Sequence, residues 1–282
     1  MGDTPRDAAG AVVDDSEQQF CYGHPKTPTK LRCSRCERPI CGRCAIPASV
    51  GQHCPECVAE ARRSAPKVRS VAMARSPAVV ALLGLNVAFF VAQQLSPAVA
   101  DRLMMSPFQV DLGEWWRLFT AMVLHAGPLH LAFNSLALWI FGPTLEEVFG
   151  TTRFVAIYVV SGLFASATSY AFGGGAASVG ASGAIFGVIG ALVVYVYRRR
   201  ASATMSAYLG NLLWVVAINL LLGFTLPRID NYAHIGGLVG GALLCLGMDR
   251  YGKNVPAAVQ AGTLAAVAAA AVALVAVGDP LG

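Results

Sequence analysis

Seven long apolar stretches, separated by short polar or glycine-containing breaks, dominate the chain after residue 76. Each is close to the roughly 20 apolar residues that a helix needs to cross a bilayer core. We therefore expect an all-α polytopic membrane protein. The predicted transmembrane helices cover residues 77–95, 128–145, 151–171, 181–198, 206–225, 232–249 and 256–277.

The first 76 residues have a different character, because they hold seven of the eight cysteines and many basic residues. Only 13% of the whole chain is charged, against roughly 25% in soluble domains. A small soluble domain is therefore expected at residues 19–60, followed by a basic linker at 61–76. Residues 1–18 are polar and acidic, which predicts a disordered N-terminus and no cleavable signal peptide.

Basic residues beside the apolar stretches predict the orientation of the chain, because they concentrate on the cytosolic side of a membrane. Alternate crossings bring most of them to one side, which we predict to be cytosolic. These residues are Arg62, Arg63, Lys67, Arg69, Arg75, Arg153, Arg198, Arg199, Arg200, Arg250 and Lys253. The opposite loops carry only Arg102, Arg117 and Arg228. Topology thus explains the net charge of +5, and nucleic acid is not an expected partner.

Polar side chains stand near the starts of three stretches that begin on the same, outer side. His130 and Asn134 lie on the second stretch, Ser182 on the fourth and His234 on the sixth. Ionisable and polar groups inside apolar spans are functional candidates. A serine with a histidine base is the core of a serine hydrolase. Asp230 is expected in the outer loop, so we predict a Ser–His dyad without an acidic third member.

Glycine spacing supports a close approach of the two helices that carry this dyad. Small residues lie on one face of each, in small-xxx-small order. They are Gly183, Gly187 and Gly190 on the fourth stretch and Gly236, Gly237, Gly240 and Gly241 on the sixth. Helix packing without catalysis would use the same glycines. His125 has two interpretations as well, a helix-entry hydrogen bond or a supporting role in the site.

The ordered motifs of residues 77–250 closely resemble the rhomboid family of intramembrane serine proteases. The matching motifs are Gly113-Glu114-Trp115-Trp116-Arg117, His125-x-Gly127-x-x-His130-x-x-x-Asn134, Glu146-x-x-x-Gly150, Tyr158-x-x-Ser161-Gly162, Gly180-x-Ser182-Gly183 and Ala233-His234-x-Gly236-Gly237. The resemblance implies a six-helix bundle, with residues 251–282 adding one C-terminal transmembrane helix. It also implies that Ser182 is the nucleophile and His234 the general base.

The same resemblance assigns supporting roles. It implies that His130 and Asn134 donate to the oxyanion and that Gly180 shapes the turn before the serine. Trp116 and Arg117 fall in the family's long first external loop, which supports the site. Where many members have a tyrosine stacked on the histidine, this chain has Phe186, which keeps the stacking and loses the hydroxyl. Family members admit transmembrane substrates through a lateral gate at the fifth helix.

The N-terminal domain carries four paired metal-ligand motifs. They are Cys21-x-x-His24, Cys33-x-x-Cys36, Cys41-x-x-Cys44 and Cys54-x-x-Cys57. Eight nitrogen and sulfur ligands suit two tetrahedral zinc ions, and a reducing cytosol disfavours disulfides. The pattern resembles a B-box-type zinc finger, which implies that the first and third pairs share one ion; sequential pairing also satisfies the spacing. His53 is expected in a loop, outside the ligand set.

These features predict an intramembrane serine endopeptidase that cleaves single-span membrane proteins near the outer face. The alternative is a catalytically silent scaffold or chaperone that binds client helices and recruits a cytosolic protein through the zinc domain. A transporter would show inverted repeats and broken midplane helices, which the sequence lacks. The Ala, Gly, Val and Arg bias favours a bacterial plasma membrane, with the bilayer itself as the surrounding partner.

Overall fold

The computed structural model describes residues 19–48, 50–64, 76–226, 229–249 and 255–278. The chain divides into two compact units, residues 1–69 and 70–282. Several sequence predictions lie outside the described residues. They concern the N-terminus at 1–18, the linker from 65 to 75 with its basic residues, and Arg228, Arg250 and Lys253.

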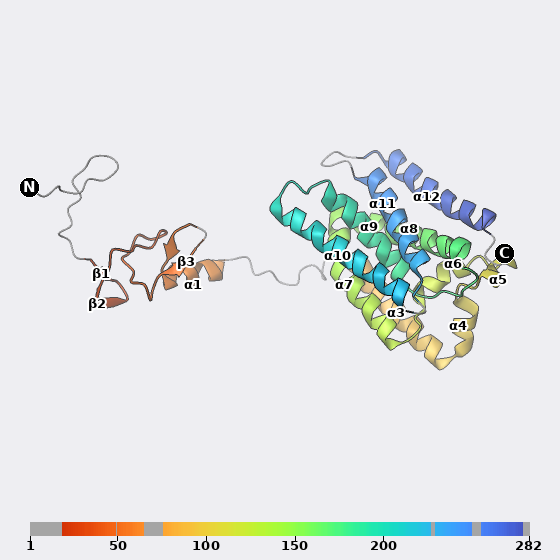
Figure 1. The fold of residues 1–282 in the computed structure, drawn as a ribbon, viewed down its shortest axis with the longest axis horizontal. Coiled ribbons are helices and arrows are strands. Elements are labelled where there is room, and N and C mark those ends of the chain that lie inside the picture. Colours follow the sequence, from red (N-terminus) through yellow and green to blue (C-terminus); the bar gives the residue numbers. More distant parts are fainter. Residues whose placement is uncertain (1–18, 49, 65–75, 227–228, 250–254, 279–282) are drawn as a thin grey trace, which may run out of the picture. The chain divides into compact units, whose positions relative to one another are not determined.

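The N-terminal unit is built from two short hairpins and one helix. Strand β1 (Phe20–Cys21) pairs antiparallel with β2 (His24–Pro28), and β3 (Ile46–Pro47) pairs antiparallel with β4 (Gln52–His53). Helix α1 (Pro55–Ser64) follows the second hairpin (Figure 1). The buried side chains of this unit are six cysteines and Ile40. So small an apolar core contributes little folding energy by hydrophobic burial.

All seven apolar stretches are helices in the described part of the chain. They are α3 (Pro77–Leu95), α7 (Pro128–Phe149), α8 (Thr151–Phe172), α9 (Ser182–Tyr197), α10 (Ala203–Thr225), α11 (Asn231–Met248) and α12 (Ala257–Val277). Five of them are long and apolar enough to cross a membrane alone. Helix α7 qualifies only together with the segment Arg117–Val123, from which it is bent by 90°. Helix α9 is shorter, with 16 residues.

Helix α7 continues beyond its predicted end at residue 145 and runs through Glu146 to Phe149. The helix can include this acidic residue because the Glu146 carboxylate is buried and accepts hydrogen bonds from the backbone N–H groups of Ala78 and Val79 at the start of α3. A charged residue thus joins two helices inside the bundle.

The connection between α3 and α7 contains four short helical segments. They are α4 (Pro97–Leu103), α5 (Pro107–Asp111), α6 (Arg117–Thr120) and the 3₁₀ turn η1 (Ala121–Val123). Arg117 is buried and donates to the carbonyl oxygens of Asp101 and Met104, at 2.7 and 3.0 Å. These bonds satisfy backbone groups that a loop would otherwise leave unpaired. The connection is therefore a folded lobe.

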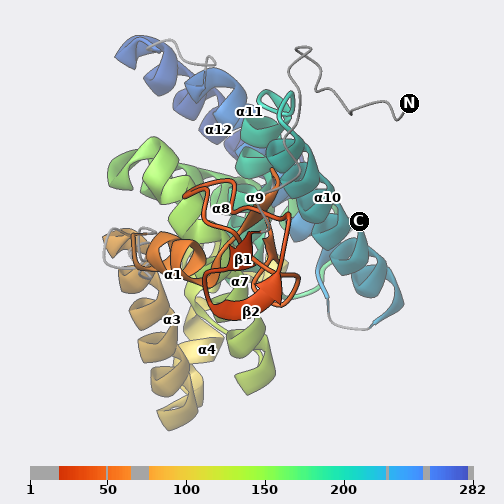
Figure 2. The same ribbon diagram turned by 90° about the vertical axis from the view of Figure 1, so that its left-hand side faces the viewer.

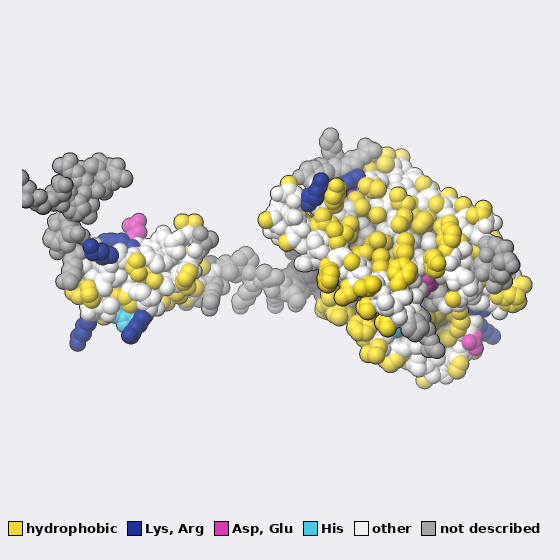
Figure 3. Space-filling view, in the orientation of Figure 1, with side chains coloured by type: hydrophobic (Ala, Val, Ile, Leu, Met, Phe, Trp, Pro, Cys, Tyr) yellow, Lys and Arg dark blue, Asp and Glu magenta, His cyan; other side chains and the backbone are white. Residues whose placement is uncertain are grey.

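Helix α9 forms the centre of the membrane unit and contacts α7, α8, α10 and α11. Helix α12 packs on α8 and α11 at the edge of the bundle, as both views show (Figure 1, Figure 2). Apolar side chains cover much of the visible surface of this unit, and few charged groups interrupt them (Figure 3). An apolar exterior around a packed helical core is the arrangement that a bilayer requires.

Candidate active site

The structure brings Ser182 and His234 together. Ser182 is the first residue of α9, and His234 lies in the first turn of α11. The Nε2 atom of His234 is 3.0 Å from the Oγ atom of Ser182, within hydrogen-bond reach. Phe186, one turn after the serine, stacks on the His234 ring with centroids 4.2 Å apart and an interplanar angle of 8°. The ring stack limits rotation of the imidazole and keeps Nε2 facing the hydroxyl.

Glycines set the close crossing of α9 and α11, as the spacing predicted. A Cβ atom at Gly237 would overlap the carbonyl group of Gly183, and a Cβ atom at Gly241 would overlap the carbonyl group of Gly187. A Cβ atom at Gly190 would likewise overlap the backbone of Leu238. The two backbones therefore touch, and larger residues would force the helices apart.

His130 and Asn134 lie beside the turn that leads into Ser182. Gly180 has φ of 136°, a conformation that L side chains rarely adopt, and a Cβ atom there would lie 2.9 Å from Nε2 of His130. The Nδ1 atom of His130 accepts a hydrogen bond from the N–H of Ala126 at 3.2 Å, so in the neutral ring the proton resides on Nε2. The Nδ2 group of Asn134 is buried and has no partner among the described residues. Two side-chain donors thus lie near the serine turn.

His125 is fully buried behind His130, with ring centroids 5.3 Å apart. Its backbone is held by one side chain of α3: the Gln93 amide donates to the His125 carbonyl at 2.6 Å and accepts from its N–H at 3.1 Å. His125 therefore packs against the His130 ring and supports it. Sequence reasoning missed Gln93, because nothing in an apolar helix distinguishes one glutamine before the fold is known.

Trp116 and Arg117 are not brought to the serine. Trp116 is exposed, and Arg117 lies in the lobe between α3 and α7, where its Nε atom also binds Glu114 at 2.5 Å. The lobe reaches the serine turn through its backbone, since Met105 and Ser178 exchange two hydrogen bonds of 3.1 and 2.9 Å. Arg117 therefore stabilises the conformation of the lobe and does not contact the serine.

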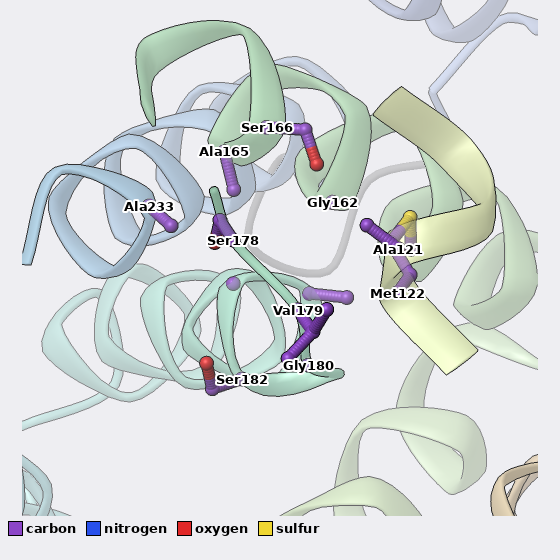
Figure 4. Close-up of a pocket in the computed structure, with 12 residues that line it drawn as sticks. Ala121, Met122, Gly162, Ala165, Ser166, Ser178, Val179, Gly180, Ser182 and Ala233 are labelled. Atoms are coloured by element: carbon purple, nitrogen blue, oxygen red, sulfur yellow. The ribbon is translucent and has the colours of Figure 1, made fainter. Parts of the chain in front are cut away.

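A small cavity adjoins Ser182, as Figure 4 shows. Its volume is about 20 Å³, which is room for about one water molecule. Most of its wall consists of Gly and Ala residues, and three serines supply polar groups. Met122 is the one large side chain in this wall, and it fills the space beside Gly162.

Asp230 lies outside the helices, as expected, at the end of the loop before α11. It is the N-cap of α11 and accepts a hydrogen bond from the N–H of Ala233 at 2.9 Å. It also accepts from the hydroxyl groups of Ser169 at 2.5 Å and Ser178 at 2.6 Å. An aspartate just before a helix is an N-cap signal, but its serine partners lie too far along the sequence to be inferred.

The N-terminal unit holds two clusters that could each bind a metal ion. One contains Cys21, His24, Cys41 and Cys44, and the other contains Cys33, Cys36, Cys54 and Cys57. The first and third motifs thus meet, as do the second and fourth, which excludes sequential pairing in this fold. In both clusters the ligand atoms lie within 4.8 Å of one another. His53 lies in β4 and joins neither cluster.

Ligand spacing in both clusters suits a metal ion, and the Cys33 thiol ionises easily. The Sγ atoms of Cys36 and Cys54 are 3.7 Å apart and those of Cys21 and Cys44 are 3.8 Å apart. A tetrahedral site with metal–sulfur bonds of about 2.3 Å places sulfurs about 3.8 Å apart. Burial acts to raise the pKa of the Cys33 thiol, but hydrogen bonds from the backbone of Cys36 and Cys54 outweigh it and lower the pKa to about 6. The thiolate is the metal-binding form.

Comparison with known proteins finds a matching family for part of the membrane unit. Residues 112–250 match the family described as Rhomboid domain. Rhomboid protease GluP of Bacillus subtilis (strain 168) is 45% identical over 152 residues, which are 52% of this chain and 30% of that protein. In Arabidopsis thaliana, RHOMBOID-like protein 6, mitochondrial, is 44% identical over 49% of this chain and 44% of its own length. RHOMBOID-like protein 2 is 47% identical over 47% of this chain and 41% of its own length. The chain thus spans less than half the length of these three relatives.

Proposed function

Residues 112–250 match the Rhomboid domain family and the helices indicate a multi-pass membrane protein; from this premise we propose that the chain is an intramembrane serine endopeptidase. The observation that supports the proposal most is the 3.0 Å approach of His234 Nε2 to Ser182 Oγ. A relative named as a rhomboid protease is 45% identical over 152 residues. Its proposed substrates are transmembrane segments of other membrane proteins.

In the proposed reaction His234 takes the proton of Ser182 while Oγ attacks the scissile carbonyl carbon. The Nε2–H of His130, the Nδ2–H of Asn134 and the Ser182 N–H stabilise the oxyanion. Collapse of the tetrahedral intermediate breaks the C–N bond, and His234 gives its proton to the leaving amine. A water molecule then hydrolyses the acyl-enzyme, with His234 again as the base. The cavity beside Ser182 has room for such a water.

The short central helix supports hydrolysis below the membrane surface. With 16 residues, α9 is about 24 Å long, less than the roughly 30 Å hydrocarbon core. Ser182 at its start would thus lie inside the bilayer, on the side that the basic residues predict to be external. We assign the chain to a bacterial plasma membrane on composition.

Helix α10 is the proposed substrate gate. Only two of its residues, Leu212 and Val216, are fully buried among the described residues, and it packs mainly on α9. Few contacts would have to break for α10 to move aside and admit a transmembrane segment. Because a helix hides its carbonyl groups in its own hydrogen bonds, the segment must also unwind locally.

A serine-directed fluorophosphonate and a model transmembrane substrate test the proposal. The wild-type protein should be labelled at Ser182 and should cleave the substrate, and both Ser182→Ala and His234→Ala should abolish the two activities. Ser161→Ala is the matched control, because this buried serine donates to backbone carbonyls of its own helix, those of Ile157 and Tyr158. A wild-type protein that neither labels nor cleaves any transmembrane substrate would favour the silent scaffold.

For the N-terminal unit we propose two structural zinc ions, one in each Cys/His cluster, and a role in contacting a cytosolic protein. Metal binding would supply the folding energy that the small core lacks. Mass spectrometry of the intact protein should find about two zinc ions per chain. A strong chelator should remove them and unfold residues 19–64 while labelling of Ser182 persists. Retention of the folded unit without metal would contradict the zinc assignment.

A further inference from the structure

Asp230 joins three elements at the active-site end of the bundle. Its Oδ2 atom accepts hydrogen bonds from Ser169 Oγ at 2.5 Å and from Ser178 Oγ at 2.6 Å. Its Oδ1 atom accepts from the N–H of Ala233 at 2.9 Å. Ser169 belongs to α8, Ala233 precedes His234 on α11, and Ser178 lies four residues before Ser182. One carboxylate therefore binds the helix of the base and the segment that delivers the nucleophile.

The segment that leads to Ser182, residues 173–181, depends on hydrogen bonds to other elements for its conformation. Residues 173–181 form neither helix nor paired strand, and Gly174 and Gly175 both have positive φ. Apart from Asp230, its described anchors are the backbone exchange with Met105 and the bond from the Gly180 N–H to Ala121 O, at 2.9 Å. Figure 4 shows the segment passing from Ser178, near Ala233, through Val179 to Gly180. Among the described residues, only the Asp230 link connects it to the start of α11 by a charge-assisted bond.

The Asp230 carboxylate does not complete a triad. The Nδ1 atom of His234 is buried and has no hydrogen-bond partner among the described residues. Both Asp230 oxygens are already engaged by hydroxyl and backbone donors. The carboxylate therefore does not orient His234 by a direct hydrogen bond, and its hydrogen bonds hold other groups in place.

We infer that Asp230 is a positioning residue that fixes the Ser182 turn against the His234 helix through its bond to Ser178. The inference rests on the proposed protease function. Hydrogen bonds to a charged acceptor are roughly twice as strong as neutral ones. Nucleophile and base must also be held closely, because a misplacement of about 1 Å can reduce a rate about 100-fold. Loss of the link should slow the chemical step and leave substrate binding unchanged.

Two serines that share Oδ2 provide a matched pair for the test. Ser178→Ala breaks the link to the nucleophile segment, whereas Ser169→Ala breaks only the link to α8. Asp230→Ala removes both links together with the helix cap. Asp230→Asn keeps a good N-cap but loses the charge, and it serves where the alanine variant does not fold. The readouts are kcat and KM on a model transmembrane substrate, the fluorophosphonate labelling rate, the thermal midpoint, and hydrogen exchange of the amides at 173–181.

Ser178→Ala and Asp230→Ala should lower kcat and the labelling rate about 10- to 100-fold at constant KM. Asp230→Asn should have a kcat and a labelling rate between those of these two variants and those of wild type. Ser169→Ala should change kcat less than about threefold. Hydrogen exchange at 173–181 should rise in Ser178→Ala and not in Ser169→Ala. If Ser178→Ala and Ser169→Ala lose the same amount of kcat, in proportion to the fall in their thermal midpoints, the inference is overturned and Asp230 is a structural anchor.

The exchange measurement does not depend on catalysis. If wild-type protein neither labels nor cleaves, the proposed function fails, and faster exchange in Ser178→Ala would still support the link. If wild-type protein is active but Asp230→Asn and Ser178→Ala match it in kcat and exchange, the proposed function stands and the positioning role is refuted.

Discussion

Replacement of Glu146 by glutamine should destabilise the membrane unit. Glu146 is 2% exposed, and its Oε1 atom accepts from the N–H of Ala78 at 3.1 Å and from Thr151 Oγ1 at 2.8 Å. Its Oε2 atom accepts from the N–H of Val79 at 3.1 Å. The carboxylate thus caps α3 from a helix 68 residues later in the chain. Glutamine has the same shape but offers one acceptor oxygen and one NH₂ group.

The cost follows from the lost acceptor. One buried N–H at the start of α3 would face an NH₂ group and lose its partner, which costs about 1–3 kcal/mol. The remaining bonds would lose their charge assistance, which adds roughly 1 kcal/mol. A total near 3 kcal/mol corresponds to a fall of roughly 6–12 °C in the thermal midpoint of a unit of this size.

Thermal unfolding of the purified full chain in detergent measures this effect, and the adjacent residue provides the control. Glu147 is exposed on the same turn of α7, so Glu147→Gln should change the free energy of unfolding by less than about 0.5 kcal/mol. If the two variants unfold within about 1 °C of each other, the buried carboxylate does not stabilise the start of α3, and the reasoning is refuted.

Three further predictions concern the site and the opposite end of α11. Gly180→Ala would place a Cβ atom 2.9 Å from His130 Nε2 and so displace that ring. The rate of fluorophosphonate labelling should therefore fall about 100-fold. An unchanged labelling rate would contradict the proposed oxyanion arrangement. Phe186→Leu removes the ring stack, worth about 0.5–1.5 kcal/mol, so kcat should fall about two- to tenfold while Phe186→Tyr stays near wild type. Burial acts to raise the pKa of Asp249, but the hydrogen bond from Arg199 outweighs it and lowers that pKa. The ion pair between Asp249 and Arg199 should therefore stabilise the fold above about pH 4 and stop doing so as the pH falls further. Thermal midpoints measured across this pH range should show the loss in wild type and no such pH dependence in Asp249→Asn.

The sequence predicted the positions of the helices because each is a long apolar stretch, and bilayer thickness fixes how long such a stretch must be. It failed where tertiary contacts decide the structure. The four short segments between residues 97 and 123 have mixed composition, and the buried Arg117 organises them through carbonyl groups up to 16 residues away. Helix α7 likewise continues through a glutamate whose partners belong to α3.

The site divides in the same way. Ser182, His234 and the glycines between their helices could be predicted as a group, because close helix crossing leaves a periodic pattern of small residues. Gln93 and Asp230 could not, since each depends on a partner whose position only the fold reveals. The proposed catalytic residues could therefore be predicted from the sequence, whereas the residues that position them could not.

The distribution of buried residues separates a tightly packed central helix, α9, from the sparsely packed helix α10, which is the proposed gate. Eleven of the 16 residues of α9 are fully buried, against two of the 23 in α10. Backbone contact with α11 holds the start of α9 in place, so the distance between Ser182 and His234 can persist while a neighbouring helix moves. Helix α10 instead presents most of its side chains to the surroundings and gives up little burial when displaced. A protease that admits a helix from the side needs both properties at once, because its catalytic distances must survive the opening that lets the substrate in.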